Sequence, residues 1–310
     1  MIPIPFAPRY PLEPLEPINR PDYIYGGRMT KEKKALFEKM RSETLKKNPG
    51  ATLDPYQESK AYFDRQEPGY TADVAKLAEQ ITAPPSPKLK AIVAIPVADH
   101  QEGKSIYNSL FNYTQQDLPK DQYEILLFVN RPQQDREGKP IAADNTMDEI
   151  QRFMADHPNM PIRIVNKIMP PDQANIGTVR KNLNDVALYR NMQRGEKAGD
   201  IIIVSNDADN KGIAPTYLSN FVDKFDKDKK VDCMLGQLDW DPESYVKYPL
   251  VHVGTRLFQY LNAIGRHNSG RMVSSGANSA FKASIYAGIG GYLSEIEGGE
   301  DIAIGQAIIE

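Results

Sequence analysis

The chain has 310 residues, and its 38 lysines and arginines nearly balance its 41 aspartates and glutamates, for a net charge of −3. This balance gives no reason to expect nucleic acid or an anionic membrane as the main partner. The lone Cys233 excludes an intrachain disulfide and a cysteine-based zinc cluster. No apolar run approaches the roughly 18 to 20 residues of a membrane span, and the N-terminus lacks a signal-peptide pattern. We therefore expect a cytoplasmic protein with no transmembrane segment in this chain.

The chain opens with prolines at a strict spacing of three, which are Pro5, Pro8, Pro11, Pro14 and Pro17. A polyproline II helix has three residues per turn, so these prolines would line one edge of an extended rod. The favoured interpretation is an arm that lies along the protein's own surface. The alternative is a docking site for a proline-reading domain.

Two helices are predicted after the proline-rich arm. The first covers about residues 30–50, and the second covers 72–81 with Val74, Leu77 and Ile81 on one stripe. The sequence "TAPPSPK" then has the composition of a linker. We therefore divide the chain into an extension over residues 1–85 and a main domain over residues 86–310.

The main domain alternates short apolar runs with segments of helical spacing. The predicted strands are 89–98, 123–130, 162–168 and 200–207, and the predicted helices are 106–114, 147–156 and 179–192. Near-continuous apolar strands alternating with helices are typical of an α/β fold with a mainly parallel sheet flanked by helices. Ligands of such sheets bind beyond the carboxyl ends of the strands, so the turns after these strands are the candidate site.

The last predicted strand ends in two aspartates, Asp207 and Asp209, in "IIIVSNDADNKG". Two carboxylates with one residue between them suit a hard divalent cation, which would in turn bridge phosphate oxygens. The alternative is that Asp209 or Asn210 caps the helix that follows. Taken alone, the aspartate pair does not distinguish metal binding from helix capping.

A second acidic pair, Glu300 and Asp301, follows a glycine-rich turn in "GIGGYLSEIEGGEDIAIG". Either carboxylate could cap the next helix, or one could act as a general base facing a substrate hydroxyl. The adjacent Gly290 and Gly291 predict a close backbone approach or a positive φ angle.

Five motifs, in order, resemble those of GT-A-type nucleotide-sugar glycosyltransferases, especially glycosyltransferase family 2. They are "AIPVADHQEG", "EILLFVN", "GTVRKN", "GDIIIVSNDAD" and "SGANSAFKASIYAGIGGYLSEIEGGEDIAIG", and together they cover about residues 89–310. The resemblance implies a Rossmann-like GT-A fold. It also implies an enzyme of the hexosyltransferase type that uses Mn²⁺ or Mg²⁺. Such an enzyme moves a sugar from a nucleoside-diphosphate sugar (a UDP- or GDP-sugar) to a hydroxyl of a glycan, a lipid or a small molecule, with inversion.

The resemblance also implies roles for particular residues. Asp207 and Asp209 match the metal-binding pair, with Asp207 also near the ribose, while Asp301 matches the catalytic base and Glu300 its companion. The residues that match nucleotide-binding or donor-binding positions are Pro96, Val97, Ala98, His100, Asn130, Arg180, Lys181 and Asn278. For Arg180 and Lys181, a solvated helix face is the alternative.

The sequence departs from the family pattern in two places. Asn130 stands where many relatives carry an aspartate pair that reads the nucleobase. The sequence therefore does not decide whether the donor nucleotide is UDP or GDP. The chain also ends at Glu310, inside the helix that the "GED" turn begins, so we expect a domain truncated at its C-terminus. A truncated domain is compatible with membrane association through a missing segment or a partner.

Residues 237–272 are expected to form the acceptor side, with most of their aromatic residues in ordinary core or interface packing. They include a second aspartate pair, Asp239 and Asp241, which ranks below Asp207 and Asp209 because no buried strand precedes it. Two other functions stay open: a sugar-nucleotide nucleotidyltransferase, and a non-catalytic relative that binds nucleotide or glycan. A nucleotidyltransferase would usually carry a basic, glycine-rich loop after its first strand, and "PVADHQEG" is not such a loop.

Overall fold

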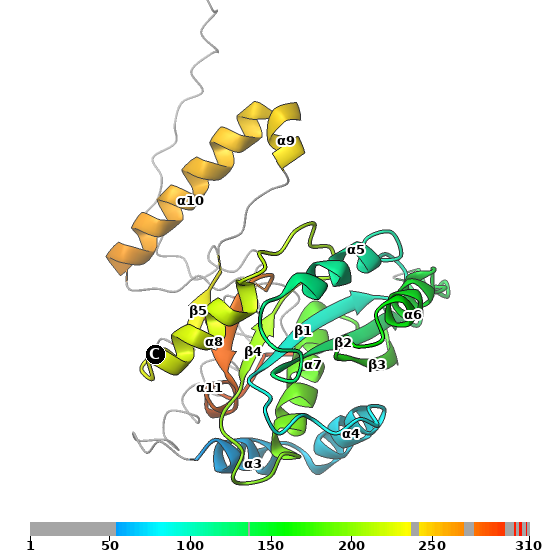
Figure 1. Cartoon of the computed structure of the whole chain (residues 1–310). Coiled ribbons are helices and arrows are strands. Elements are labelled where there is room, and N and C mark those ends of the chain that lie inside the picture. Colours follow the sequence, from blue (N-terminus) through cyan, green and yellow to red (C-terminus); the bar gives the residue numbers. More distant parts are fainter. Residues whose placement is uncertain are drawn as a thin grey trace, which may run out of the picture.

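The computed structural model describes residues 54–135, 137–236, 242–269 and 276–294, together with residues 301, 304, 305 and 308. Its centre is a six-stranded sheet (Figure 1). The strands are β1 (Ala91–Ala98), β2 (Tyr123–Pro132), β3 (Ile162–Met169), β4 (Ile202–Ser205), β5 (Cys233–Leu235) and β6 (Ser279–Lys282). The first four confirm the strands predicted from the apolar runs.

The sheet order is β3-β2-β1-β4-β6-β5. Strands β1 to β4 are parallel, whereas β6 runs antiparallel to both β4 and β5. The predicted α/β class with a mainly parallel sheet is therefore confirmed. Strands β5 and β6 were not predicted, because three or four residues are too few to show a periodic pattern.

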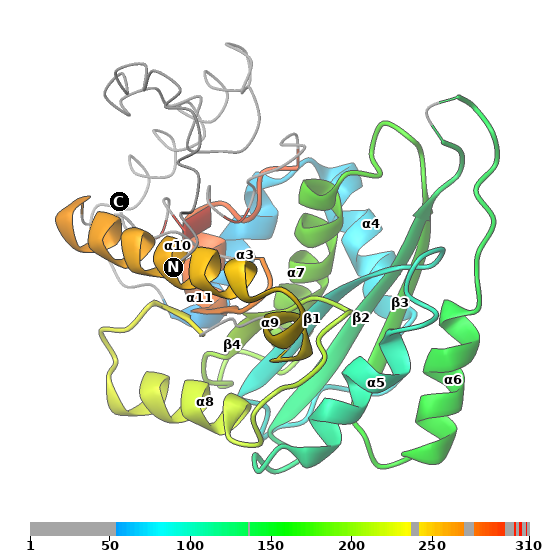
Figure 2. The ribbon, with the colours of Figure 1, turned by 90° about the horizontal axis from the view of Figure 1, so that it is seen from above.

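Helices cover both faces of the sheet, as Figure 2 shows from above. One face carries α5 (Ile106–Phe111), the short 3-10 helix Asn112–Gln115, α6 (Thr146–Asp156) and α8 (Tyr217–Lys227). The other face carries α3 (Pro55–Arg65), α4 (Pro68–Glu79), α7 (Ile176–Met192) and α11 (Ala283–Gly288). The helices predicted over 106–114, 147–156 and 179–192 are confirmed as α5 with the 3-10 turn, α6 and α7.

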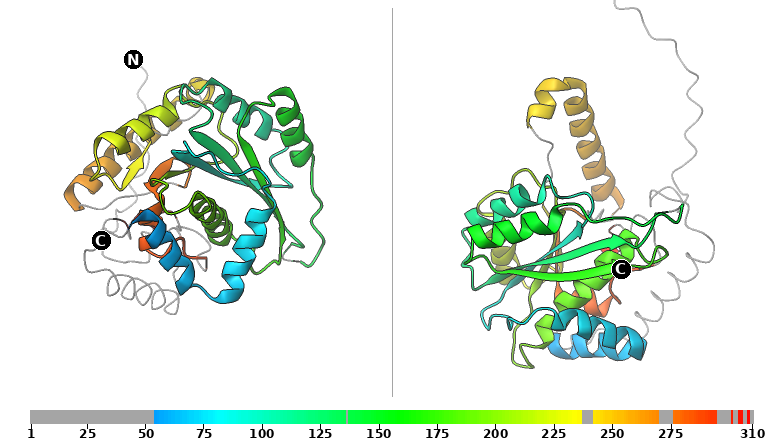
Figure 3. Two further views of the ribbon diagram at one scale, coloured as in Figure 1. Left: turned by 60° about the horizontal axis from the view of Figure 1, so that its bottom comes forward. Right: turned by 90° about the vertical axis from the view of Figure 1, so that its right-hand side faces the viewer.

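Helix α7 is buried on nearly every side, because the sheet covers one side of it and α3 and α4 curve around the other (Figure 3). Asn175 caps its first turn, with the side-chain oxygen accepting from the Thr178 N–H at 2.8 Å. Polar side chains on this helix therefore face protein on all sides, and each needs a specific partner. Two of these side chains, Arg180 and Lys181, were predicted to bind nucleotide.

The predicted helix over 72–81 is confirmed as α4, and its apolar stripe packs into the main core. Val74 is fully buried and Leu77 is 7% exposed. The core that contains them also contains Leu89 and Ile92, beyond the polar stretch 82–88. The division near residue 85 therefore runs through a continuous hydrophobic core. The proline-rich arm and the helix predicted over 30–50 lie outside the described residues.

We expect Val74→Ala to lower the free energy of unfolding by about 1–3 kcal/mol, because it removes buried methyl groups and leaves a cavity. Val246→Ala is the matched control, since Val246 is 86% exposed, and its effect should stay within about 0.5 kcal/mol. Urea unfolding of both variants measures the difference. Equal effects of the two substitutions would contradict the integration of α4 into the core.

The glycine-rich turn after α11 behaves as predicted. Gly290 and Gly291 have φ angles of 94° and 77°, which favour glycine. A Cβ on Gly291 would also lie 2.7 Å from the Tyr62 hydroxyl oxygen and 3.0 Å from that of Tyr286. Both the positive φ angle and the close approach are therefore confirmed at Gly291.

Two helices stand apart from the sheet and its covering layers (Figures 1 and 3), namely α9 (Pro242–Lys247) and α10 (Pro249–Ser269). They pack on each other, with the Tyr245 ring edge-on to His252 at 4.2 Å between centroids. Tyr248 and Tyr260 are 52% and 65% exposed, so neither packs in a core within the described structure, and their packing at an interface stays a prediction. Among the described helices, none is long and apolar enough to cross a membrane.

Candidate active site

The sheet has a topological switch point between β1 and β4. From β1 the chain proceeds outward through β2 to β3, and it then returns to place β4 on the other side of β1. The connections after β1 and β4 diverge here, at the position where open α/β sheets bind their ligands, and we call this edge of the sheet the crevice. The segment 99–102 follows β1, and Asp207 and Asp209 follow β4.

Glu102 lies close enough to three other carboxylates at this crevice to feel their charge. Burial raises the pKa of the Glu102 carboxyl, and the charges of Asp209, Asp207 and Asp144 raise it further, against a hydrogen bond from Ser105 that lowers it. Burial and the neighbouring negative charges both disfavour the ionised form of Glu102. Glu102 and Asp144 were not among the site residues predicted from the sequence. The available signal for Glu102 was its place in the turn after the first strand.

Arg180 connects α7 to the end of β4. Its side chain is 5% exposed, and its Nη2 lies 2.8 Å from Asp207 Oδ1. Its Nη1 donates to Ser205 Oγ at 2.7 Å and to the Gly276 carbonyl at 2.9 Å. Arg180 is therefore not on a solvated helix face, and it fixes one oxygen of Asp207.

Gly276 joins this group to Asp301. Its N–H donates to Asp301 Oδ2 at 2.8 Å, while its carbonyl accepts from Arg180. A Cβ at Gly276 would lie 2.5 Å from Arg180 Nη2, so a larger residue here would displace the guanidinium. The contacts thus run from Asp207 through Arg180 and Gly276 to Asp301. Glu300 lies outside the described residues.

Asp209 and Asn210 do not cap the next helix. Helix α8 begins at Tyr217 with Thr216 at its N-cap position, so the capping alternative for these residues is wrong. Asn210 instead donates from Nδ2 to the Asp207 carbonyl at 2.7 Å and to Asn206 Oδ1 at 2.8 Å. The first of these two hydrogen bonds fixes the backbone carbonyl of Asp207. Asp209 is exposed, so its carboxylate faces solvent at the crevice.

The residues predicted to hold the nucleoside gather at the ends of β1 and β2. Pro96, Val97 and Ala98 are the last residues of β1, and Ala98 pairs with Asn130 in the register of the sheet. Asn130 Nδ2 donates to the Val97 carbonyl at 3.2 Å. His100 follows in the turn, where its Nε2 is 2.9 Å from Gln101 Nε2.

A buried ion pair that the sequence did not reveal stiffens this end of β1. Asp99 is 3% exposed, and its carboxylate pairs with the Arg131 guanidinium from the end of β2. The Asp99 N–H also donates to the Asn130 carbonyl at 2.8 Å. The ends of the two strands are therefore held together by side-chain and backbone contacts. The partner of Asp99 lies across the strand pair, so spacing along the chain did not indicate it.

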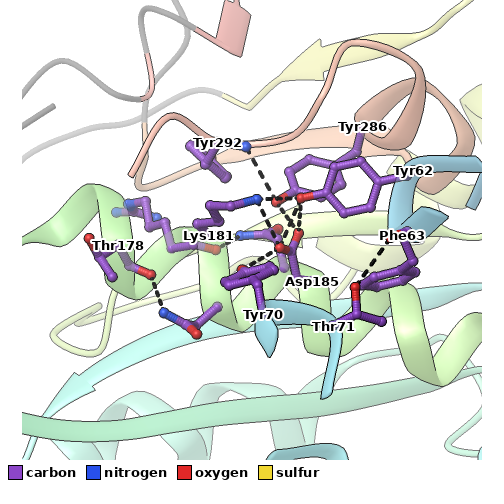
Figure 4. A network of polar contacts seen from close by, with 12 residues as sticks. Tyr62, Phe63, Tyr70, Thr71, Thr178, Lys181, Asp185, Tyr286 and Tyr292 are labelled. Atoms are coloured by element: carbon purple, nitrogen blue, oxygen red, sulfur yellow. Dashed lines mark hydrogen bonds and ion pairs between the residues drawn. The ribbon is translucent and has the colours of Figure 1, made fainter. Parts of the chain in front are cut away.

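Lys181 lies in a different environment from Arg180 (Figure 4). Its Nζ is 2.5 Å from the Tyr62 hydroxyl and 3.0 Å from Asp185 Oδ2. The fully buried Asp185 also accepts from the hydroxyls of Tyr62, Tyr70 and Tyr286 at 2.5 to 2.8 Å. Lys181 thus neutralises a buried carboxylate on the α3 and α4 side of α7. We leave it out of the proposed nucleotide site.

Asn278 is 6% exposed and lies two residues beyond Gly276, just before β6. Its Oδ1 accepts from the Tyr217 hydroxyl at 2.8 Å, and its carbonyl accepts from the Gly236 N–H at 2.9 Å. These contacts connect the start of α8, the end of β5 and the Gly276 segment. Asn278 thereby fixes the position of the segment that contains Gly276.

The carboxylates at the crevice suit a hard divalent cation in their chemistry. Asp207 and Asp209 both reach solvent, and oxygen is the ligand atom that Mg²⁺ and Mn²⁺ prefer. Within the described residues, no group of three or more His, Cys, Asp or Glu side chains is arranged to hold a metal ion. A cation at this pair would take its remaining ligands from water and from a substrate.

No family model and no curated protein matches the chain. Solved structures with similarity to it include a mannosyltransferase from Pyrobaculum calidifontis, PcManGT, in complex with GDP-Man and Mn²⁺. The identity is 16%, the TM-score is 0.43, and the alignment covers 86% of this chain and 61% of that one.

S. aureus TarS (residues 1–349) is also similar, with 13% identity and a TM-score of 0.41, over 69% of this chain and 53% of that one. The same protein in complex with UDP-GlcNAc gives 13% identity and a TM-score of 0.36, over 64% and 46% of the two chains. The present chain thus spans about half to three fifths of the length of these structures. With TM-scores below 0.5, these similarities carry no argument about activity.

Proposed function

We propose that this chain is a divalent-metal-dependent glycosyltransferase of the hexosyltransferase type. It moves a sugar, with inversion, from a nucleoside-diphosphate sugar to an acceptor hydroxyl. The observation that carries the proposal is the chain of contacts from Asp207 through Arg180 and Gly276 to Asp301. This chain connects a carboxylate at the end of a buried strand with a carboxylate from a distant turn. In the proposed enzyme the donor would lie between these two carboxylates, with Asp207 serving the metal and Asp301 serving as the base.

The nucleoside is expected to lie over the ends of β1 and β2, against Pro96 to Ala98, His100 and Asn130. The polar groups available there are the Asn130 amide and the His100 imidazole. Asn130 both donates and accepts hydrogen bonds, so these groups favour neither uracil nor guanine. The donor is therefore a UDP- or GDP-sugar. The acceptor is a hydroxyl of a glycan, a lipid or a small molecule.

Asp207 and Asp209 would hold Mn²⁺ or Mg²⁺ beside the donor diphosphate. When bound, the cation would neutralise the negative charge that develops on the diphosphate leaving group. Arg180 adds a fixed positive charge next to Asp207, and its low exposure means that little solvent screens it. Arg180 therefore orients the Asp207 carboxylate and favours anionic groups at the crevice.

Asp301 would act as the general base. The acceptor oxygen attacks the anomeric carbon as the bond from that carbon to the diphosphate oxygen breaks, and the hydroxyl proton passes to the Asp301 carboxylate. The nucleoside diphosphate then leaves with the bonding electron pair. The N–H of Gly276 holds Oδ2 of Asp301 in a fixed orientation, which a base needs in order to face the acceptor.

The test of this function is a donor panel. Purified protein with Mn²⁺ is incubated with UDP- and GDP-sugars, and the release of nucleoside diphosphate is measured. We expect release from one nucleotide class. Formation of a nucleotide–sugar from a nucleoside triphosphate and a sugar phosphate would instead assign a nucleotidyltransferase. Nucleotide binding with no turnover on any donor would assign a non-catalytic protein.

The metal assignment has its own prediction. We expect Asp209→Ala to lose most of the Mn²⁺-dependent part of UDP or GDP binding, measured by calorimetry with and without Mn²⁺. Asp223→Ala on α8 is the control, because Asp223 is an exposed aspartate in an ion pair with Lys227. Unchanged metal-dependent affinity in Asp209→Ala would rule out this residue as a ligand.

A further inference from the structure

The turn that carries Asp207 and Asp209 is built on a buried side chain, Asn206. This residue directly follows β4 and is 3% exposed, and its backbone N–H donates to the Ala94 carbonyl of β1 at 3.1 Å. Its side-chain amide therefore lies inside the protein, where both the oxygen and the nitrogen need partners. Those partners decide how the turn is held.

The amide oxygen of Asn206 holds the turn at both of its ends. Oδ1 accepts from the Asp207 N–H at 3.1 Å and from Asn210 Nδ2 at 2.8 Å. One contact is thus made to a candidate metal ligand itself, and the other to the residue that follows Asp209. Between the two aspartates, Ala208 is 3% exposed and belongs to the core under α5, α6 and α8. The backbone of the turn is therefore fixed at its ends and in its middle, while the two carboxylates reach solvent.

The amide nitrogen of Asn206 contacts a residue far away in the chain, Tyr113. Asn206 Nδ2 lies 2.8 Å from the Tyr113 hydroxyl oxygen. Tyr113 is fully buried in the 3-10 helix that follows α5. From the same 3-10 helix, Asn112 Nδ2 donates to the Asn210 carbonyl at 3.1 Å. Two side chains of this helix therefore support the turn, one through Asn206 and one at Asn210.

We propose that Asn206 and Tyr113 are positioning residues for the metal site, which hold Asp207 and Asp209 in place without touching the cation. The inference rests on the proposed function, because it needs the two aspartates to be metal ligands. Groups that orient metal ligands typically change metal affinity by about 10 to 100-fold when they are removed. Mg²⁺ is especially sensitive to such changes, since it requires nearly ideal octahedral geometry.

An amide at position 206 meets two requirements at once. It both donates and accepts hydrogen bonds, so it can accept from the turn while it donates to Tyr113. An aspartate there would only accept, and it would add a third negative charge beside Asp207 and Asp209. Asn206 thus fixes the turn and leaves the charge of the site to the two candidate ligands.

The test is Tyr113→Phe, which removes one hydroxyl oxygen and keeps the ring in the core. Calorimetry on the full chain measures UDP and GDP binding with and without Mn²⁺. We expect the Mn²⁺-dependent part of the affinity to fall about tenfold, because Asn206 Nδ2 loses its partner and no longer fixes the turn. Nucleotide binding without Mn²⁺ should stay unchanged. Asn206→Ala removes the contacts on both sides of the amide and should weaken Mn²⁺-dependent binding at least as much.

The matched control is Tyr123→Phe. Tyr123 is 1% exposed and belongs to the same core as Tyr113, but its hydroxyl donates to the Tyr113 backbone carbonyl at 3.2 Å and not to the turn. The two tyrosine variants should therefore lose a similar amount of melting temperature, whereas Mn²⁺-dependent binding should fall only in Tyr113→Phe.

The possible results separate this inference from the proposed function. Mn²⁺-dependent binding that is unchanged in Tyr113→Phe, or equally weakened in Tyr123→Phe, overturns the positioning role and leaves the metal site standing. A loss of cooperative melting in Tyr113→Phe and Asn206→Ala would assign the pair to folding and overturn the role as well. An unmodified chain whose nucleotide binding does not respond to Mn²⁺ would overturn the metal assignment, and this inference with it.

Discussion

Asp301→Asn is expected to lower turnover by about 10² to 10⁴-fold while donor affinity changes little. General-base catalysis contributes about this much, and asparagine cannot accept a proton at neutral pH. Its side-chain oxygen still accepts the hydrogen bond that Gly276 now donates to Asp301. The substitution therefore removes the chemistry and keeps the contact. Steady-state kinetics give the change in turnover, and calorimetry with the donor nucleotide gives the change in affinity.

Two controls separate catalysis from structure at this position. Asp223→Asn, on the exposed face of α8, should leave turnover unchanged. The thermal unfolding of Asp301→Asn should remain cooperative and close to that of the unmodified protein. Near-normal turnover would remove Asp301 from the mechanism, and a collapse of folding would assign it a structural role. Retention of the anomeric configuration in the product would exclude direct displacement.

Arg190→Met is expected to lower the free energy of unfolding by about 3–5 kcal/mol. Arg190 on α7 forms a two-point ion pair with Glu124 on β2, with Nε to Oε1 at 2.6 Å and Nη2 to Oε2 at 2.8 Å. The two side chains are only 1% and 2% exposed. The substitution leaves Glu124 buried with a weaker partner, Arg163, whose Nε is 3.5 Å away. Urea unfolding measures the loss.

Lys227→Met is the control, because Lys227 is 75% exposed in its ion pair with Asp223. Exposed pairs contribute about 0–1 kcal/mol, so this variant should be close to neutral. The double variant Glu124→Leu/Arg190→Met should recover much of the stability, since it removes both buried charges. A double variant no more stable than Arg190→Met would show that packing, and not the unpaired carboxylate, sets the loss.

The sequence alone predicted the features that depend on neighbouring residues. The apolar runs gave four strands of the sheet and the α/β class, because burial on both faces demands near-continuous apolar side chains. Asp207 and Asp209 were proposed as site residues because they follow such a run directly. Gly291 was found because a double glycine indicates backbone geometry that other residues avoid.

Only the tertiary structure decided which side chains meet. Arg180 and Lys181 are adjacent in sequence, yet one contacts Asp207 and the other Asp185, because consecutive residues on a helix point about 100° apart. The contact from Gly276 to Asp301 and the pair from Arg190 to Glu124 join segments far apart in the chain.

The exposure of the apolar residues of α10 could not be predicted from the sequence for the same reason. Its apolar periodicity is present in the sequence, but periodicity alone does not tell whether a stripe faces the core or solvent. That choice depends on the layers already packed around the sheet. Helices α5, α6 and α8 cover one face, and α3, α4, α7 and α11 cover the other. Local residue order thus determined the elements and the chemistry at strand ends, while the packing of distant segments decided partners and exposure.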